Sequence, residues 1–196
     1  MIAFALAVFF LIITPGPGVL SIAGVGAAFG RTAGLRYMIG LFIGTNLTAL
    51  MVVSGLAAAL MADDRIRTVL ATLSIAYLLY LAFRIAFAGS RIAFIRRAAP
   101  PGVRGGILLQ LVNPKSYAVN VALFSGFVIY PEDPALEVVL KFLVMGAIWV
   151  PIHSLWLWAG LRLEALDLPE GRQRAINVAM AAAMLIVVGL AVFAPG

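Results

Sequence analysis

The feature that most limits the fold of this chain is a set of six long apolar runs, separated by connections that hold most of the charges. A helix needs about 20 apolar residues to cross the hydrocarbon core of a bilayer, and each run meets or approaches that length. The sequence therefore predicts an all-α integral membrane protein with six transmembrane helices. The runs span roughly residues 2–29, 37–61, 67–88, 106–130, 137–161 and 175–194.

Composition supports a membrane protein and excludes a soluble one. Hydrophobic residues make up 64% of the 196 residues and charged residues only 11%, whereas a soluble domain is typically about 25% charged. The net charge of +6 does not indicate nucleic-acid binding, because the arginines lie in gaps between apolar runs, where positive charge orients a membrane protein. We therefore expect the lipid bilayer, and no nucleic acid, as a partner.

Positive charge is distributed unevenly over the five connections. The second and fourth hold only Arg65, Arg67 and Lys141 as cations. The positive-inside rule therefore places the odd connections in the cytoplasm. We expect a multi-pass protein of the cell inner membrane, with a retained first helix and both termini on the periplasmic or outer side. The cations in or beside the odd connections are Arg31, Arg36, Arg84, Arg91, Arg96, Arg97, Arg104, Arg162, Arg172 and Arg174.

The third connection is the longest and divides the chain into two halves of three runs. We expect one transporter domain over 1–196, with half-repeats at about 1–88 and 105–196 and a basic cytoplasmic linker over 89–104. Part of this linker is either a basic helix on the inner leaflet or a solvated segment. Because each half has an odd number of spans, the halves must insert with opposite topology. Inverted repeats of this kind are typical of secondary transporters.

Two apolar runs carry helix breakers at comparable depths. The stretch "TPGPGVL" places Pro15 and Pro17 in the middle of the first run, and "NPK" places Asn113, Pro114 and Lys115 in the fourth. A proline removes a backbone donor and clashes with the preceding turn. Unpaired backbone groups at membrane depth are tolerated only where they face a protein-buried or watered cavity. The pattern predicts two broken helices around a midplane site; the alternative is a pair of kinks that only aid packing.

With these residues, the chain resembles the LysE/RhtB family of amino-acid exporters. The resemblance lies in the length, the number of runs, the proline-glycine-proline break, the Asn-Pro-Lys motif and a series of glycines, and it covers nearly the whole chain. It implies a proton-driven efflux transporter that moves amino acids or related small metabolites out of the cell. Among the glycines, we expect Gly34, Gly40 and Gly44 to allow close helix packing. The series is Gly24, Gly26, Gly30, Gly34, Gly40 and Gly44.

The broken helices predict a site for an anionic group. A half-helix that begins at a proline presents free N–H groups, and these attract a carboxylate. The glycines around the first break let a ligand approach the backbone. Lys115 adds a full positive charge, although it could instead cap a carbonyl or extend toward the interface. The predicted substrate-binding residues are Pro15, Gly16, Pro17, Gly18, Asn46, Asn113, Pro114 and Lys115.

Other polar side chains lie deep in the apolar runs. Together they could hydrogen-bond an amino group, or each could join helices. His153, the only histidine, is a candidate for proton coupling because its unperturbed pKa lies near neutrality, and hydrogen bonding to a nearby carbonyl is the alternative. We expect Trp149, Trp156 and Trp158 to serve packing and the interface. The polar group comprises Ser21, Thr45, Asn46, Asn113 and Asn120.

Missing residue types narrow the function further. All eight acids lie at the ends of runs or in connections, so a cationic substrate would have no carboxylate partner at the midplane, and a neutral zwitterion is favoured. One histidine and no cysteine leave neither a zinc site nor a Ser/His/Asp set. We therefore expect no metal, no cofactor and no enzymatic activity. The alternative function is a structural or assembly subunit, and a homo-oligomer stays open.

Overall fold

The computed structural model describes residues 1–14, 16–55 and 99–165, with single positions and short runs between 63 and 83 and between 169 and 186. Throughout these residues its elements are helices, which confirms the all-α prediction. The linker over 89–104 and the runs over 67–88 and 175–194 lie mostly outside the described residues. The helices are α1 (Ile2–Ile13), α2 (Pro17–Val53), α5 (Gly102–Val112), α6 (Pro114–Ser125) and α7 (Pro134–Ala165).

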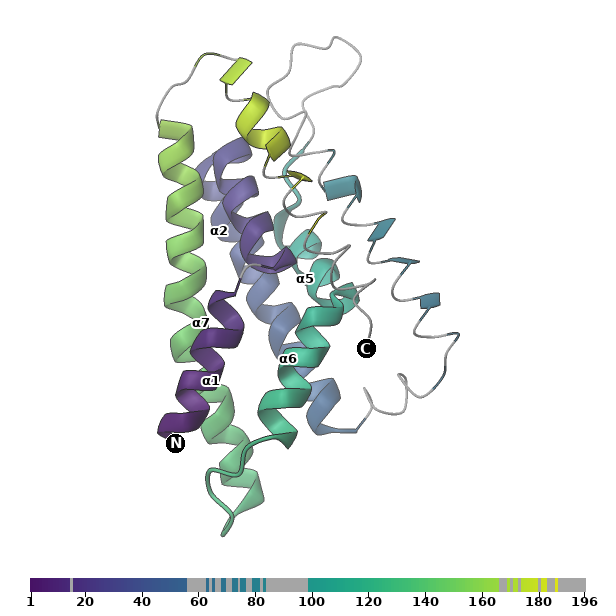
Figure 1. Ribbon diagram of the computed structural model, residues 1–196, viewed down its shortest axis with the longest axis vertical. Coiled ribbons are helices and arrows are strands. Elements are labelled where there is room, and N and C mark those ends of the chain that lie inside the picture. The colour runs from purple at the N-terminus through teal and green to yellow at the C-terminus, as the bar shows by residue number, and fades with distance from the viewer. Residues whose placement is uncertain are drawn as a thin grey trace.

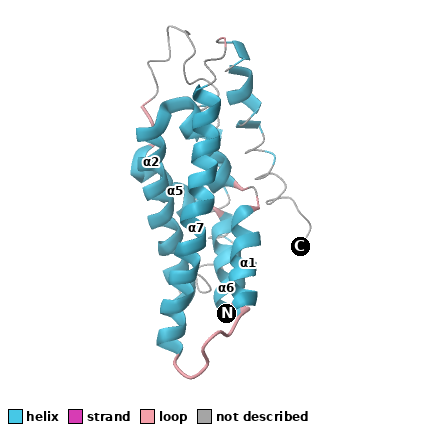
Figure 2. Ribbon diagram, turned by 90° about the vertical axis from the view of Figure 1, so that its left-hand side faces the viewer, coloured by secondary structure: helices cyan, strands magenta, loops and turns pink. Residues whose placement is uncertain are grey.

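The described helices form an upright bundle in which α7 runs along most of its length (Figure 1). The short helices α1 and α6 lie at the same end of the bundle in both views (Figure 2). Two described helical stretches are long and apolar enough to cross a membrane: Pro17–Val53, with a mean hydropathy of 1.4, which Gly30 divides into two segments, and Pro134–Leu163, with 2.0. Large apolar side chains on the outside of α7, such as Leu143 and Leu155, form a surface suited to lipid.

The first run is interrupted as the sequence predicts. Helix α1 ends at Ile13, and the Thr14 hydroxyl donates to Phe10 O at 2.6 Å, which satisfies a carbonyl of its last turn. Gly16 is extended, and α2 begins at Pro17, which occupies its first turn. Proline suits that position because its missing N–H would have no partner in the helix.

A reversal inside α2 corrects the predicted connection between the first two runs. Gly30 has a φ of 78°, a left-handed conformation that costs little without a Cβ. The chain turns back there, since a Cβ on Gly34 would lie 3.6 Å from Gly26 Cα. Residues 31–36, predicted as a connection, are therefore helical. The second helical segment ends at Val53, and the predicted end of the run near residue 61 lies outside the described residues.

The fourth run is broken between α5 and α6, as predicted. Asn113 interrupts the helix with a φ of −79° and a ψ of 108°, and α6 begins at Pro114. The Asn113 side chain accepts a hydrogen bond from Lys115 N at 3.1 Å, so it caps the new helix. Helix α6 ends at Ser125, about one turn before the predicted end of the run.

Glycines set the close approach of the helices, as expected for Gly34, Gly40 and Gly44. A Cβ on Gly40 would meet the Val103 carbonyl of α5, and a Cβ on Gly44 would lie 2.7 Å from Gln110 Cβ. On the other side of α2, a Cβ on Gly34 would meet Leu157 of α7. Small residues permit such backbone approach in membrane helices, so these contacts hold α5 and α7 against the second segment of α2.

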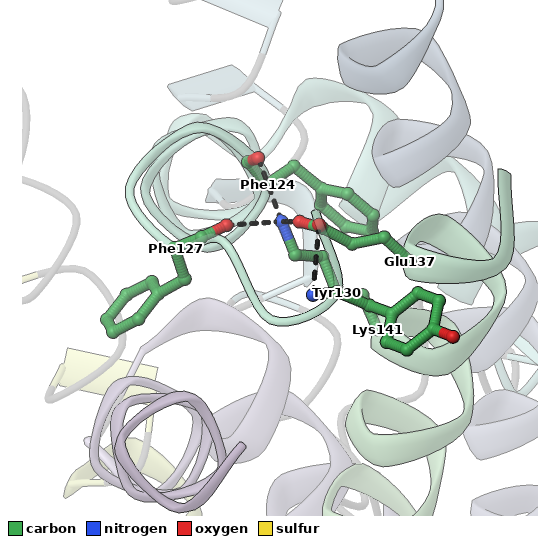
Figure 3. A network of polar contacts seen from close by, with 5 residues as sticks. All are labelled: Phe124, Phe127, Tyr130, Glu137 and Lys141. Carbon is green, nitrogen blue, oxygen red and sulfur yellow. Dashed lines mark hydrogen bonds and ion pairs between the residues drawn. The ribbon is translucent and has the colours of Figure 1, made fainter. Parts of the chain in front are cut away.

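Lys141 ties the start of α7 to the end of α6 (Figure 3). It is 2% exposed; its Nζ pairs with Glu137 at 2.7 Å and donates to Phe127 O at 2.6 Å and Phe124 O at 3.1 Å. Glu137 also accepts from Tyr130 N at 3.2 Å. The sequence analysis placed Lys141 among the cations of the fourth connection. It is instead buried, and it caps one carbonyl in the last turn of α6 and one just past the end of that helix.

Candidate functional site

A cavity of about 60 Å³ lies where the two helix breaks meet. One water needs about 10–15 Å³ measured in this way, so the space exceeds that of a single water. All five described helices contribute to its wall. The lining residues are Leu11, Ile12, Thr14, Gly16, Gly18, Val19, Thr45, Gln110, Asn113, Lys115, Ser116, Val119, Asn120, Met145, Trp149 and His153.

Lys115 joins the two breaks. It lies in the first turn of α6, and its Nζ donates to Thr14 O, just past the end of α1, at 2.5 Å. A Cβ on Gly16 would lie 2.8 Å from Lys115 Cδ, so glycine leaves room for the lysine. An ammonium has three donors, and one of them goes to Thr14 O. The carbonyl cap that the sequence left open is therefore present, and among the described residues the other two donors have no partner, so they are available to an occupant of the cavity.

One chain of hydrogen bonds begins at the second break. Asn113 Nδ2 donates to Gln110 Oε1 at 2.9 Å, and Gln110 Nε2 donates to Thr45 Oγ1 at 2.6 Å. The Thr45 hydroxyl then donates to Leu41 O at 2.8 Å. These bonds hold the side chains at the end of α5 against α2, and each of their donors is used by the next residue of the chain of hydrogen bonds.

A second chain of hydrogen bonds joins α6 to α2. Asn120 Nδ2 lies 3.0 Å from Thr48 Oγ1, and Ser116 Oγ lies 2.8 Å from the same atom. The Thr48 hydroxyl donates to Thr45 O at 2.9 Å. Asn120 therefore donates to Thr48, while the bond between the Thr48 and Ser116 hydroxyls can run in either direction. Thr48, Ser116 and Asn120 are all buried.

His153 is buried in the wall formed by α7. Its Nδ1 lies 3.0 Å from Trp149 O, and the two rings are stacked with centroids 3.6 Å apart. A carbonyl only accepts, so in the neutral ring Nδ1 carries the proton and Nε2 is an acceptor. A Cβ on Gly18 would lie 3.8 Å from His153 Nε2, which places this acceptor beside the first turn of α2. Trp149, predicted to serve packing, also lines the cavity.

The structure brings most of the predicted site residues together. Pro17 and Pro114 begin the helices beside the cavity, and Pro15 lies outside the described residues. Asn46 is not part of the lining, and its Nδ2 donates to Phe42 O in its own helix at 2.8 Å. The predicted residues that line the cavity are Gly16, Gly18, Asn113, Lys115 and His153.

The sequence analysis missed Gln110 and Ser116, both of which line the cavity. Gln110 precedes Asn113 by three residues, which places the two side chains on one helix face. Ser116 precedes Asn120 by four and shares its face in the same way. Pairs of polar residues at these spacings were the available signal.

Comparison with known proteins gives a match along most of the chain. A family model described as LysE type translocator matches residues 9–195. The chain is 31% identical over 176 residues to an uncharacterized membrane protein of Pseudomonas aeruginosa, covering 83% of this chain and 80% of that protein. It is 28% identical over 162 residues to a cysteine/O-acetylserine efflux protein of Klebsiella pneumoniae, covering 82% of each. No solved structure matches significantly.

Proposed function

This chain belongs to the LysE type translocator family, and from that premise we propose that it exports a small neutral amino acid from the cytoplasm across the inner membrane. Because the family consists of translocators, the prediction of a membrane transporter rather than an enzyme is confirmed. The relative named as a cysteine/O-acetylserine efflux protein supports a small metabolite as substrate. The observation that carries the proposal is the cavity in which both helix breaks and Lys115 meet.

The charges of the wall favour a zwitterion. Lys115 and His153 line the cavity, and the described lining contains no carboxylate. An α-carboxylate would meet the two free donors of Lys115 and the helix N-termini that begin at Pro17 and Pro114. A cationic side chain would enter the same space without a partner, which is costly at membrane depth. Amino acids without a side-chain charge fit this wall.

Transport requires the cavity to open to each side in turn. We propose that the chain has six transmembrane helices in two inverted repeats, and that the breaks at Gly16 and Asn113 are corresponding hinges. The matching positions of these breaks in the first and fourth runs support this arrangement. Each break separates a short helix from the next segment, so one side can tilt while the other stays packed.

We further propose His153 as the proton carrier. Its side chain is 3% exposed and its Nε2 is free to accept a proton from the cavity side. Lys115 is the charged group that lines the same cavity, so a protonated His153 would be repelled by it unless a substrate carboxylate lies between them. That repulsion couples proton entry to substrate binding.

Flux in proteoliposomes tests the exporter. The purified protein is reconstituted with a panel of labelled amino acids, beginning with L-cysteine, and flux is compared with that of protein-free vesicles. Saturable movement of at least one neutral amino acid, without comparable movement of lysine or arginine, is the expected result. If no member of the panel moves, the exporter proposal is wrong and a structural or assembly role is favoured.

A further inference from the structure

Asn120 holds an acceptor that the protein leaves unused. Its side chain is 1% exposed and lines the cavity. In the part of the chain that the structure describes, its Oδ1 has no hydrogen-bond partner. A buried acceptor without a donor is destabilising, so such atoms are normally satisfied by water or a ligand. The Oδ1 atom itself is covered by its neighbours, so a donor in the cavity that Asn120 lines reaches it once the surrounding side chains shift.

The hydrogen bond to Thr48 uses the NH₂ end of the Asn120 amide. The Thr48 hydroxyl has Thr45 O and Ser116 Oγ as partners for its proton, and its oxygen accepts from Asn120 Nδ2, 3.0 Å away. This bond already joins α6 to α2 through Nδ2, so the contact between the helices does not need Oδ1. The carbonyl oxygen is left over for another purpose.

We propose that Asn120 Oδ1 is the subsite for the ammonium group of the transported amino acid. This inference rests on the proposed function and assigns an orientation to the substrate. The carboxylate lies toward Lys115, and the ammonium lies toward Asn120. These residues are five apart on α6, a rise of about 7.5 Å, so they contact opposite ends of a small zwitterion rather than the same atom.

A neutral carbonyl suits this role better than a carboxylate would. The positive charge of a zwitterion is balanced by the substrate's own carboxylate, so the wall needs to supply an acceptor and no net charge. A carboxylate at the same place would attract cationic amines that lack a carboxylate. The amide thus favours α-amino acids both over such amines and over carboxylic acids that lack the amino group.

The test compares an amino acid with its analogue that lacks the amino group, in wild type and in Asn120→Leu. The probe is L-cysteine against 3-mercaptopropanoate, or the best-exported member of the panel against its corresponding analogue. Leucine keeps the side-chain size but removes the acceptor. We expect the wild type to prefer the amino acid about tenfold to hundredfold, and Asn120→Leu to lose most of that preference. A general loss of stability weakens both probes and leaves their ratio unchanged.

Asn46→Leu is the matched control, because it makes the same change at an asparagine that does not line the cavity and that donates to Phe42 O in its own helix. It should retain the preference even if its melting temperature falls. Asn120→Asp keeps an acceptor oxygen and adds negative charge, so it should keep or raise the preference; this variant decides the matter if Asn120→Leu does not fold.

An unchanged ratio in Asn120→Leu, or a lowered ratio in Asn120→Asp, would overturn the subsite and place the amino group elsewhere, such as at His153 Nε2. Failure of the wild type to export any amino acid would instead refute the proposed function and the subsite with it.

Discussion

Replacing Lys115 with methionine tests separately its hydrogen bond to Thr14 O and its proposed contact with the substrate carboxylate. Methionine keeps an unbranched chain of similar length and removes the ammonium, together with its bond to Thr14 O. A hydrogen bond to a charged group contributes about 1.5–3 kcal/mol. Placing a lysine at membrane depth costs about 3 kcal/mol on insertion scales. These two terms nearly cancel, so Lys115→Met should leave the ligand-free melting temperature close to that of wild type.

Substrate affinity has no such compensation. If the two remaining donors of Lys115 hold the substrate carboxylate, methionine removes both, and the loss of even one charge-assisted bond lowers the apparent affinity about tenfold to hundredfold. Binding of the best-exported amino acid to purified protein, measured by calorimetry beside thermal unfolding, gives both quantities. Wild-type affinity in Lys115→Met would refute the carboxylate site and leave the lysine as a cap of α1 alone.

Two neighbouring variants sharpen the comparison. Gly16→Ala would place a Cβ 3.0 Å from Lys115 Nζ, so the lysine must shift while its charge stays, and an intermediate loss of affinity is expected. Pro114→Ala restores a backbone donor at the break and favours helix continuity. It should impair transport with Lys115 still present. If both variants behave as wild type, the geometry of the breaks does not matter for binding.

Three further predictions concern topology, packing and coupling. Single cysteines at Asp133 and Arg97 should react with impermeant thiol reagents from opposite faces; labelling of both from outside would contradict the outward termini. Gly40→Ala drives a Cβ into a backbone carbonyl of α5 and should cost about 1–3 kcal/mol in thermal unfolding, whereas Gly171→Ala, with open space around it, should not. His153→Gln should abolish accumulation driven by a pH gradient but retain exchange, and wild-type accumulation would exclude His153 as carrier.

The helix breaks could be predicted from the sequence because their cause is local. Pro17 and Pro114 lack the backbone donor that a continuing helix needs, whatever packs around them. Asn113 next to a proline is likewise a cap by its own chemistry. These features depend on a few consecutive residues. The structure places both breaks where the sequence predicted them, and it adds the cap by Asn113.

The reversal at Gly30 depends on contacts that no local pattern contains. Its left-handed φ is within reach of any glycine, and the series in α2 offers several. Gly30 becomes the turning point because Gly26 and Gly34 can then approach each other closely. The burial of Lys141 also depends on contacts that are distant in sequence. Glu137, four residues earlier, predicts an ion pair, but the carbonyls of Phe124 and Phe127 that accept from Lys141 lie in and just after α6.

The polar side chains that line the cavity were predictable in part, because some of their placement is local and some depends on contacts between helices. Side chains three or four residues apart share a helix face, so Gln110 with Asn113, and Ser116 with Asn120, were each predictable as pairs. Asn46 is displaced by one position from Thr45 and therefore faces another direction, as its bond within its own helix shows.

Periodicity thus predicts which residues form the wall but not which atom stays free. That depends on the direction of each hydrogen bond across the helices. Asn120 donates its amide nitrogen to Thr48, so the atom of Asn120 that stays free is an acceptor. A substrate that binds there must bring a donor, whatever its side chain.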